Sequence, residues 1–253
     1  MNNGAPIVSV VMAVHAGNME EVHASTSSII NQSYRNIEFI IVDDGNEAPI
    51  SDYLCSLSEK YNHVLIVKNN SNIGLTLSLI KAIEIASGKY IARQDADDVS
   101  NIERIGEQVR FLEKHTNLVL LGTGAIVVDH VTRSHSQYVL PGSHDEILDL
   151  MFEINPFCHS SVMFRLEAYQ FAGGYDAKFQ TSQDFDLWFR LLDHGQFSIL
   201  AKNLVTRNVT PNSLSSNFRK AFQQIKNGFC VRIRERHRSS QRYLSVKISL
   251  IFI

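Results

Sequence analysis

Three carboxylates crowd the end of a short apolar run, at Asp95, Asp97 and Asp98. The residues before them, Tyr90–Ala92, have the composition of a buried strand. Like charges at this spacing repel, so a folded chain tolerates them best where a cation or strong hydrogen-bond donors neutralise them. Oxygen ligands favour a hard ion that takes its remaining ligands from water and substrate phosphates. The stretch Gly88–Asp98 therefore predicts a site for Mg²⁺ or Mn²⁺ and a diphosphate.

A plainer interpretation of these carboxylates stays open on local sequence. Ser100-Asn-Ile-Glu103 has the spacing of a capping box, in which a serine and a glutamate satisfy the first backbone donors of a helix. The carboxylates would then belong to a solvated acidic turn in front of that helix. An Asp-x-Asp motif by itself does not distinguish the two interpretations.

A second pair of carboxylates, Asp43 and Asp44, follows another apolar run, Ile37–Val42. Two further strand-like runs, Ile7–Val14 and Val64–Val67, alternate with stretches of helical periodicity. Strands separated by helices imply right-handed crossovers and a mostly parallel sheet flanked by helices, so the predicted fold class is α/β. Both acidic strand ends then lie along one edge of the sheet, where a nucleotide is expected.

Another carboxylate, Asp184, stands at the start of a predicted helix over Gln183–Arg190. Phe185, Trp188 and Phe189 form an apolar stripe on this helix. Backbone donors at a helix start hold a carboxylate ionised, which gives Asp184 a possible chemical role. An N-cap of the helix is the structural alternative.

The amino-acid composition indicates which classes of protein the chain can belong to. The chain has 253 residues, 44% of them hydrophobic and 20% charged, which is ordinary for a soluble globular protein. Its three cysteines are far apart, so neither a disulfide framework nor a zinc site is indicated. The first residues do not resemble a secretory leader, and no apolar stretch reaches the roughly 20 residues of a membrane span. We therefore expect a cytoplasmic protein.

The charge is distributed unevenly. Residues 219–253 carry nine Lys and Arg against the single acidic residue Glu235. Phe222, Ile225, Phe229 and Ile233 share one helical face within this stretch. A basic amphipathic helix of this kind binds anionic membrane surfaces, and a solvated charged face is the alternative. Few aromatic residues interleave the charges, so no nucleic acid partner is expected.

Taken together, the motifs resemble glycosyltransferase family 2, inverting enzymes of the GT-A fold of the bacterial surface-polysaccharide type. The resemblance runs from about Ile7 to Ser215. It implies one glycosyltransferase domain over residues 1–215, with a nucleotide-binding half at about 1–100, an acceptor half at about 101–215, and a basic, apolar extension over residues 216–253. The matching pieces are Val8–Met12, Ser28–Ser33, Ile41–Gly45, Asn72–Gly74, Gly88–Asp98, Arg104 with Gln108, Gly173–Asp176 and Gln183–Arg190.

The resemblance also implies roles for individual residues. Asp184 is the expected catalytic base, Asp97 the direct metal ligand, and Asp95 a neighbour of the ribose or the metal. Arg93 faces the nucleotide or pairs with Asp95. The remaining residues assigned to the nucleotide sugar are Ala13, Val14, His15, Asp43, Asp44, Asn72 and Ala96.

The chain departs from the family pattern at several positions. Ala13 and His15 replace the usual Pro and Tyr of the first turn, and Gln183 replaces a Glu beside Asp184. Some relatives place a His near the metal after the last strand, where this chain reads Arg207-Asn-Val-Thr-Pro-Asn-Ser213. No His is available there.

The expected reaction is transfer of a sugar, with inversion, from a nucleoside diphosphate sugar, most simply UDP-linked. The expected acceptor is a lipid-linked saccharide for surface polysaccharide such as O-antigen or capsule, met at the cytoplasmic face of the inner membrane. A non-catalytic nucleotide-sugar-binding relative is the alternative. A nucleotidyltransferase fits poorly because no Lys or Arg precedes Arg35, and a nicotinamide dehydrogenase fits poorly because the first turn lacks Gly-x-Gly-x-x-Gly.

Overall fold

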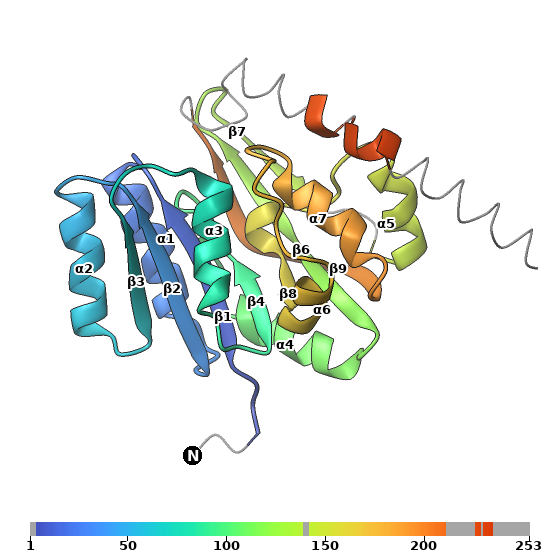
Figure 1. Cartoon of the computed structure of the whole chain (residues 1–253), viewed down its shortest axis with the longest axis horizontal. Helices are drawn as coiled ribbons and strands as arrows, with labels where there is room; N and C mark the ends of the chain where they lie inside the picture. The colour runs from blue at the N-terminus through green and yellow to red at the C-terminus, as the bar shows by residue number, and fades with distance from the viewer. Residues whose placement is uncertain (1–3, 139–141, 211–225, 229, 235–253) are drawn as a thin grey trace, which may run out of the picture.

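One mixed sheet of nine strands forms the centre of the protein (Figure 1). The computed structural model describes residues 4–138, 142–210, 226–228 and 230–234. The strands are β1 (Val8–Val14), β2 (Ile37–Asp44), β3 (Val64–Asn69), β4 (Tyr90–Arg93), β5 (Val99–Ser100), β6 (Leu118–Asp129), β7 (Ser134–Tyr138), β8 (Met163–Arg165) and β9 (Gln196–Val209). The helices are α1 (Met19–Ile30), α2 (Ile50–Lys60), α3 (Leu75–Glu84), α4 (Arg104–Lys114), α5 (His144–Met151), the 3₁₀ helix η1 (His159–Ser161), α6 (Leu166–Phe171) and α7 (Gln183–Leu191).

The sheet has a parallel half and a mixed half. Its strand order is β3-β2-β1-β4-β8-β6-β9-β5, with β7 paired to β6. The first four strands of this order are all parallel, whereas β8 is antiparallel to both of its neighbours. The α/β class and the parallel sheet edge predicted from the sequence are therefore confirmed for β1 to β4.

Helices cover both faces of the sheet, because alternate residues of the buried strands point to opposite sides. One core contains Val8, Val10 and Met12 of β1 with apolar residues of α1, α2 and α4. The other contains Val11 of β1 and Ile91 of β4 with apolar residues of α3, α5, α6 and α7. The chain is thus a three-layer α/β/α structure.

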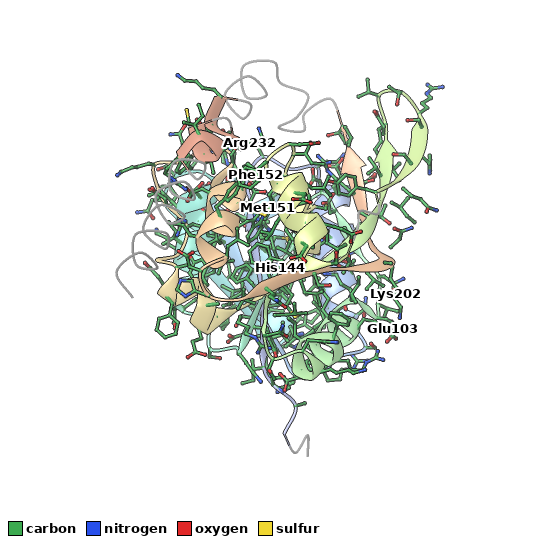
Figure 2. All side chains as sticks on the ribbon, turned by 90° about the vertical axis from the view of Figure 1, so that its right-hand side faces the viewer. Glu103, His144, Met151, Phe152, Lys202 and Arg232 are labelled. Atoms are coloured by element: carbon green, nitrogen blue, oxygen red, sulfur yellow. The ribbon has the colours of Figure 1, made fainter. Side chains whose placement is uncertain are left out.

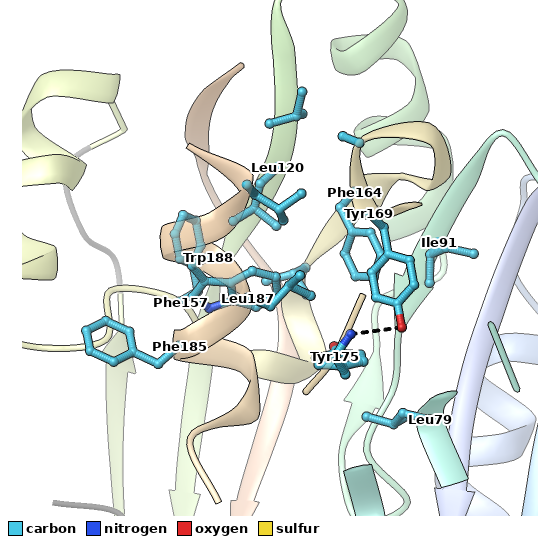
Figure 3. Close-up of a cluster of buried hydrophobic side chains, with 14 of the residues drawn as sticks. Leu79, Ile91, Leu120, Phe157, Phe164, Tyr169, Tyr175, Phe185, Leu187 and Trp188 are labelled. Atoms are coloured by element: carbon cyan, nitrogen blue, oxygen red, sulfur yellow. Dashed lines mark hydrogen bonds between the residues drawn. The ribbon is translucent and has the colours of Figure 1, made fainter. Parts of the chain in front are cut away.

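The second core is centred on aromatic side chains (Figure 3). Trp188 of α7 is fully buried and meets Phe157 and Phe164 edge-on, with ring centroids 5.9 and 6.2 Å apart. The Tyr169 hydroxyl accepts a hydrogen bond from the Tyr175 amide at 3.1 Å, the dashed line in Figure 3. The apolar stripe predicted for α7 therefore packs into this core and fixes the start of the helix.

Strand β6 is continuous through Gly122-Thr-Gly124. Gly122 is needed there for close approach, since a Cβ would lie 2.7 Å from a Phe157 ring carbon. The segment Cys158–Phe164 is divided between η1 and the beginning of β8.

The capping box that was the alternative interpretation of Ser100–Glu103 is not formed. Helix α4 begins after Glu103, which makes no side-chain cap. The Ser100 hydroxyl instead donates to Gln94 Oε1 at 2.7 Å and accepts from Arg104 at 2.6 Å. Ser100 therefore stabilises the acidic loop from within, and the plainer interpretation of the carboxylates loses its support.

The described part of the C-terminal extension packs on α7. Its helical residues 226–228 and 230–234 lie beside α5 in Figures 1 and 2. Val231 is buried in the second core, and Arg234 Nη1 lies 2.8 Å from Asp186 Oδ1. Ile233 is 41% exposed, so in the described residues Val231 occupies the packed face. Phe222, Ile225 and Phe229 lie outside the described residues, as do the predicted boundary at 215/216 and the apolar run 243–253.

Candidate active site

A cavity of about 350 Å³ lies where the β4 end, η1, β9 and the start of α7 meet. Asp95, Asp97 and Asp98 line it from the loop after β4, and Asp184 lines it from α7. The structure therefore brings together two of the three acidic positions that the sequence analysis singled out.

Asp95 is held by a buried cation and a hydroxyl. Arg93, which has no exposed surface, forms an ion pair with Asp95 Oδ1, and Ser160 donates to Oδ2 at 2.6 Å. Burial by itself raises the pKa of Asp95, but the charge of Arg93, together with His159, the Ser160 hydrogen bond and Arg207, outweighs it and holds that pKa below its usual range. Of the two roles predicted for Arg93, the pairing with Asp95 is thus confirmed.

The pKa values of Asp97 and Asp98 are raised, in contrast to that of Asp95. Burial and the charge of Asp95 raise the pKa of Asp97 to about 6. Burial, Asp95 and Asp97 raise the pKa of Asp98 to about 7. Asp98 accepts hydrogen bonds from Ser160 and from the Asn208 backbone amide at 2.9 Å, so it ties the loop to β9.

Asp184 is the second residue of α7 and is only 9% exposed. Ser182, with φ of 61°, is the N-cap residue, so the N-cap alternative for Asp184 is wrong. Its Oδ2 accepts a hydrogen bond from Asn155 Nδ2 at 2.7 Å. Asp186, two residues on, is 1% exposed and pairs with Arg190 at 2.7 Å and Arg234 at 2.8 Å. Its carboxylate is therefore engaged in packing α7.

His159 reaches the cavity from η1. Its Nε2 lies 3.0 Å from the Tyr175 hydroxyl. Burial, and next the charge of Arg93, lower the pKa of His159, which favours the neutral ring. Among the described residues that line the cavity, His159 is the one histidine.

The two carboxylates at the end of β2 accept hydrogen bonds from the protein's own backbone and side chains. Asp44, 2% exposed, accepts hydrogen bonds from Asn69 Nδ2 at 2.8 Å and from the amides of Ile73 and Gly74 at 2.9 Å. Asp43 accepts from Ser51 at 2.6 Å and from Asn46. Burial raises the pKa of Asp43, but these hydrogen bonds lower it further than burial raises it. Neither lines the 350 Å³ cavity, so their contact with a nucleotide stays a prediction.

The other predicted nucleotide residues surround the same strand ends. Ala13 and Val14 end β1, and Nδ1 of the exposed His15 lies 2.9 Å from the Asp44 carbonyl oxygen. Asn72 is exposed, and Ala96 packs against the first core. Gly45, at φ of 74°, lets the chain pass the backbone of Asn72, because a Cβ there would lie 2.5 Å from its amide nitrogen.

Sequence reasoning missed several residues that line the cavity. They are Tyr138, Asn155, Phe157, His159, Ser160, Arg207 and Asn208. The polar cluster Cys158–Ser161 between apolar residues was the available signal. Asn155 and Arg207 carried no local signal at all.

Arg104 of α4 connects the residues on either side of the acidic loop through hydrogen bonds. It has no exposed surface and donates to Gln94 Oε1 at 2.8 Å, to Ser100 at 2.6 Å and to the Arg93 carbonyl at 2.6 Å. Burial is the main reason why the pKa of Arg104 is lowered to about 10. The family motif of Arg104 with Gln108 thus has a structural role, since Arg104 Nε also donates to Gln108.

We expect Arg104→Met to lower the free energy of unfolding by about 3 kcal/mol or more, because three buried acceptors lose their donor. At about 2–4 °C per kcal/mol, the melting temperature should fall by about 10 °C in calorimetry. The control is Arg110→Met on the same helix, whose side chain is 67% exposed. Equal melting temperatures for the two variants would contradict this role of Arg104.

The carboxylates around the cavity fit a hard divalent ion. Both Asp95 oxygens are engaged by Arg93 and Ser160, whereas Asp97 lines the cavity beside them. Among the described residues, no three His, Cys, Asp or Glu side chains are arranged to hold an ion by themselves. Mg²⁺ and Mn²⁺ are commonly bound by one or two carboxylates together with substrate phosphates, which is the arrangement that Asp97 and Asp95 permit. Within the described residues, no helix has the length and apolar character needed to cross a bilayer.

Comparison with known proteins identifies relatives along most of the chain. The protein named "Putative glycosyltransferase EpsE" of Bacillus subtilis is 36% identical over 203 residues, which are 77% of this chain and 69% of that protein. The O-antigen biosynthesis glycosyltransferase WbnJ of Escherichia coli is 32% identical over 189 residues, 74% of this chain and 72% of the other. The amylovoran biosynthesis glycosyltransferase AmsE of Erwinia amylovora is 29% identical over 179 residues, 70% of this chain and 65% of the other.

The solved structures that match share the fold at low identity. The crystal structure of S. aureus TarS has a TM-score of 0.66 at 15% identity, and its complex with UDP has a TM-score of 0.66 at 18% identity. These matches cover 79% and 81% of this chain, but the chain spans only about 60% of the TarS structures. Residues 9–171 match the family described as Glycosyl transferase family 2. With the fold and the identities above, this match shows that the chain belongs to glycosyltransferase family 2.

Proposed function

We propose that this protein transfers a sugar, with inversion, from a UDP-linked or related nucleoside diphosphate sugar to an acceptor hydroxyl. The observation that carries the proposal is the shared cavity of Asp95, Asp97 and Asp184. It joins oxygen ligands suited to a metal diphosphate with a separate carboxylate suited to take a proton. That a solved structure of the same fold contains UDP supports this choice of donor.

In the proposed reaction Asp184 accepts the proton of the acceptor hydroxyl as its oxygen attacks the anomeric carbon. The bond between that carbon and the β-phosphate oxygen breaks, and the nucleoside diphosphate leaves with the electron pair. Asp97, with Asp95 beside it, would hold Mn²⁺ or Mg²⁺, which when bound offsets the negative charge on the leaving diphosphate. A single displacement of this kind inverts the anomeric centre. The buried walls from η1 and α7 orient the two substrates.

The acceptor we propose is a lipid-linked saccharide used for surface polysaccharide. The names of WbnJ and AmsE, which refer to O-antigen and amylovoran biosynthesis, support this class of acceptor. The basic residues 219–253 support a place on the cytoplasmic surface of an anionic membrane.

Turnover of nucleotide sugars tests the proposal directly. The protein is incubated with a panel of UDP-, GDP- and dTDP-sugars in Mn²⁺ or Mg²⁺, and release of free nucleotide is followed. We expect slow hydrolysis of one donor without acceptor. Tight donor binding with no release, with or without added lipid-linked acceptor, would instead support a non-catalytic nucleotide-sugar-binding protein.

Membrane binding is tested by neutralising charge rather than by truncation, because deleting residues 219–253 would also remove the contacts of Val231 and Arg234 with the domain. We expect replacement of Arg236, Arg238, Arg242 and Lys247 by Gln to release the protein from anionic vesicles at low salt. At about 1 kcal/mol per charge, the partition coefficient should fall by about two to three orders of magnitude in a sedimentation assay.

The control for this experiment removes as many positive charges from the domain. Its four exposed substitutions to Gln are at Arg35, Lys60, Lys114 and Arg133. If both variants bind vesicles equally, the extension does not provide the membrane contact.

A further inference from the structure

The Asp184 carboxylate is held by an amide from another segment of the chain. Asn155, in the loop between α5 and η1, donates from Nδ2 to Asp184 Oδ2 at 2.7 Å. Both residues line the cavity. An ionised carboxylate only accepts hydrogen bonds, so the NH₂ group of Asn155 must face Asp184.

The side-chain oxygen and the backbone carbonyl of Asn155 also accept hydrogen bonds. Its Oδ1 accepts a hydrogen bond from the Phe157 amide at 3.3 Å, which agrees with the NH₂ group facing Asp184. Its backbone carbonyl accepts from the Tyr138 hydroxyl at 3.2 Å. The amide is therefore oriented before any substrate binds, at little further entropic cost.

The loop and the helix are joined through the same core. Phe157 is 5% exposed and meets Trp188 of α7 edge-on at 5.9 Å. The ring is seated against Gly122, where a Cβ would clash with it. Close packing of this kind resists displacement, so Asn155 and Asp184 keep one mutual distance.

We propose that Asn155 is a positioning residue for the proton transfer, an inference that rests on the proposed function of Asp184. The amide occupies Oδ2 and fixes the orientation of the carboxylate. It leaves Oδ1 as the atom that takes the acceptor proton. Asn155 thereby selects both the rotamer and the reacting oxygen of the base.

Other charged and titratable groups face the same space and enter any measurement of pH dependence. Burial is the main influence on the pKa of both His159 in η1 and Tyr175 in the loop after α6, and each of them is also within reach of the charge of Asp184. Asp95, Asp97, Asp98 and Arg207 line the cavity from the β4 loop and β9. All of them are unchanged in the variants below, so differences between the variants report on position 155.

The experiment compares the pH dependence of kcat/KM for wild type, Asn155→Ala and Asn155→Asp, with the donor found in the nucleotide-sugar panel. We expect Asn155→Ala to lower kcat about 30-fold with the donor KM within twofold, because a charge-assisted hydrogen bond is lost. In Asn155→Asp two carboxylates share one proton, so the acidic limb should move to higher pH by on the order of one unit or more.

Two measurements separate positioning from stability. Glu153→Gln, an exposed change in the same loop, should keep the wild-type profile. The shift in melting temperature on adding UDP and Mn²⁺ should be the same in all variants, which shows intact donor sites. An acidic limb of Asn155→Asp that coincides with that of wild type, or an Asn155→Ala kcat within twofold of wild type, would overturn the role of Asn155. A wild-type protein that turns over no donor would instead overturn the proposed function, and this inference with it.

Discussion

Replacing Asp184 by Asn is expected to reduce sugar transfer by about 10²–10⁴-fold, the usual contribution of a positioned general base. The affinity for UDP in Mn²⁺ should stay within twofold, since Asp184 lies on α7 and the ion is assigned to the β4 loop. Initial rates with acceptor and calorimetric titration with UDP measure the two quantities. The amide is isosteric with the carboxylate, so the packing of α7 should be retained.

Asp149→Asn is the matched control, because Asp149 is an exposed carboxylate on α5 away from the cavity lining. It should transfer sugar at the wild-type rate. If Asp184→Asn also transfers at near-normal rate, the proton acceptor lies elsewhere in the cavity. Asp186 is a poor substitute because its carboxylate is buried between Arg190 and Arg234.

The second large effect is expected from Asp97→Asn. Loss of the proposed direct metal ligand should lower turnover by about 10³-fold, which corresponds to several kcal/mol of charge stabilisation at the leaving diphosphate. The affinity for UDP should fall in Mn²⁺ and change little in EDTA. Titrations with and without the ion therefore distinguish loss of a metal ligand from general damage.

Asp52→Asn serves as the control for Asp97→Asn, since it removes one exposed carboxylate from α2. It should leave both turnover and metal-dependent binding unchanged. Unchanged turnover of Asp97→Asn in saturating Mn²⁺ would remove Asp97 from the metal shell, with Asp95 left as its remaining candidate.

The parallel half of the fold could be predicted because its strands are continuous apolar runs that end in acid. Ile37–Val42 and Tyr90–Ala92 are buried on both faces, so their sequences are almost free of polar residues. Because these strands are parallel, their carboxyl ends lie at the same edge of the sheet. This is why the positions of Asp43, Asp95 and Asp97 at strand ends were predictable without a structure.

The mixed half could not be predicted in the same way. β9 lies between β6 and β5, yet its burial alternates irregularly and its register with β6 shifts at Gly124. Its place depends on long-range pairing, which leaves little local pattern. Asn155 meets Asp184 only because a loop after α5 is packed against α7, and no local sequence signal encodes such a contact.

The contacts of β9 and of residues 226–228 and 230–234 also bear on the order in which a nascent chain matures. The first core is not complete within the first 100 residues, because it includes Ile105, Leu121 and Met163. Asp98 gains its Asn208 partner, and Asp186 its Arg234 partner, only after these partners have left the ribosome. We therefore expect the acidic loop and α7 to reach their final packing late in synthesis.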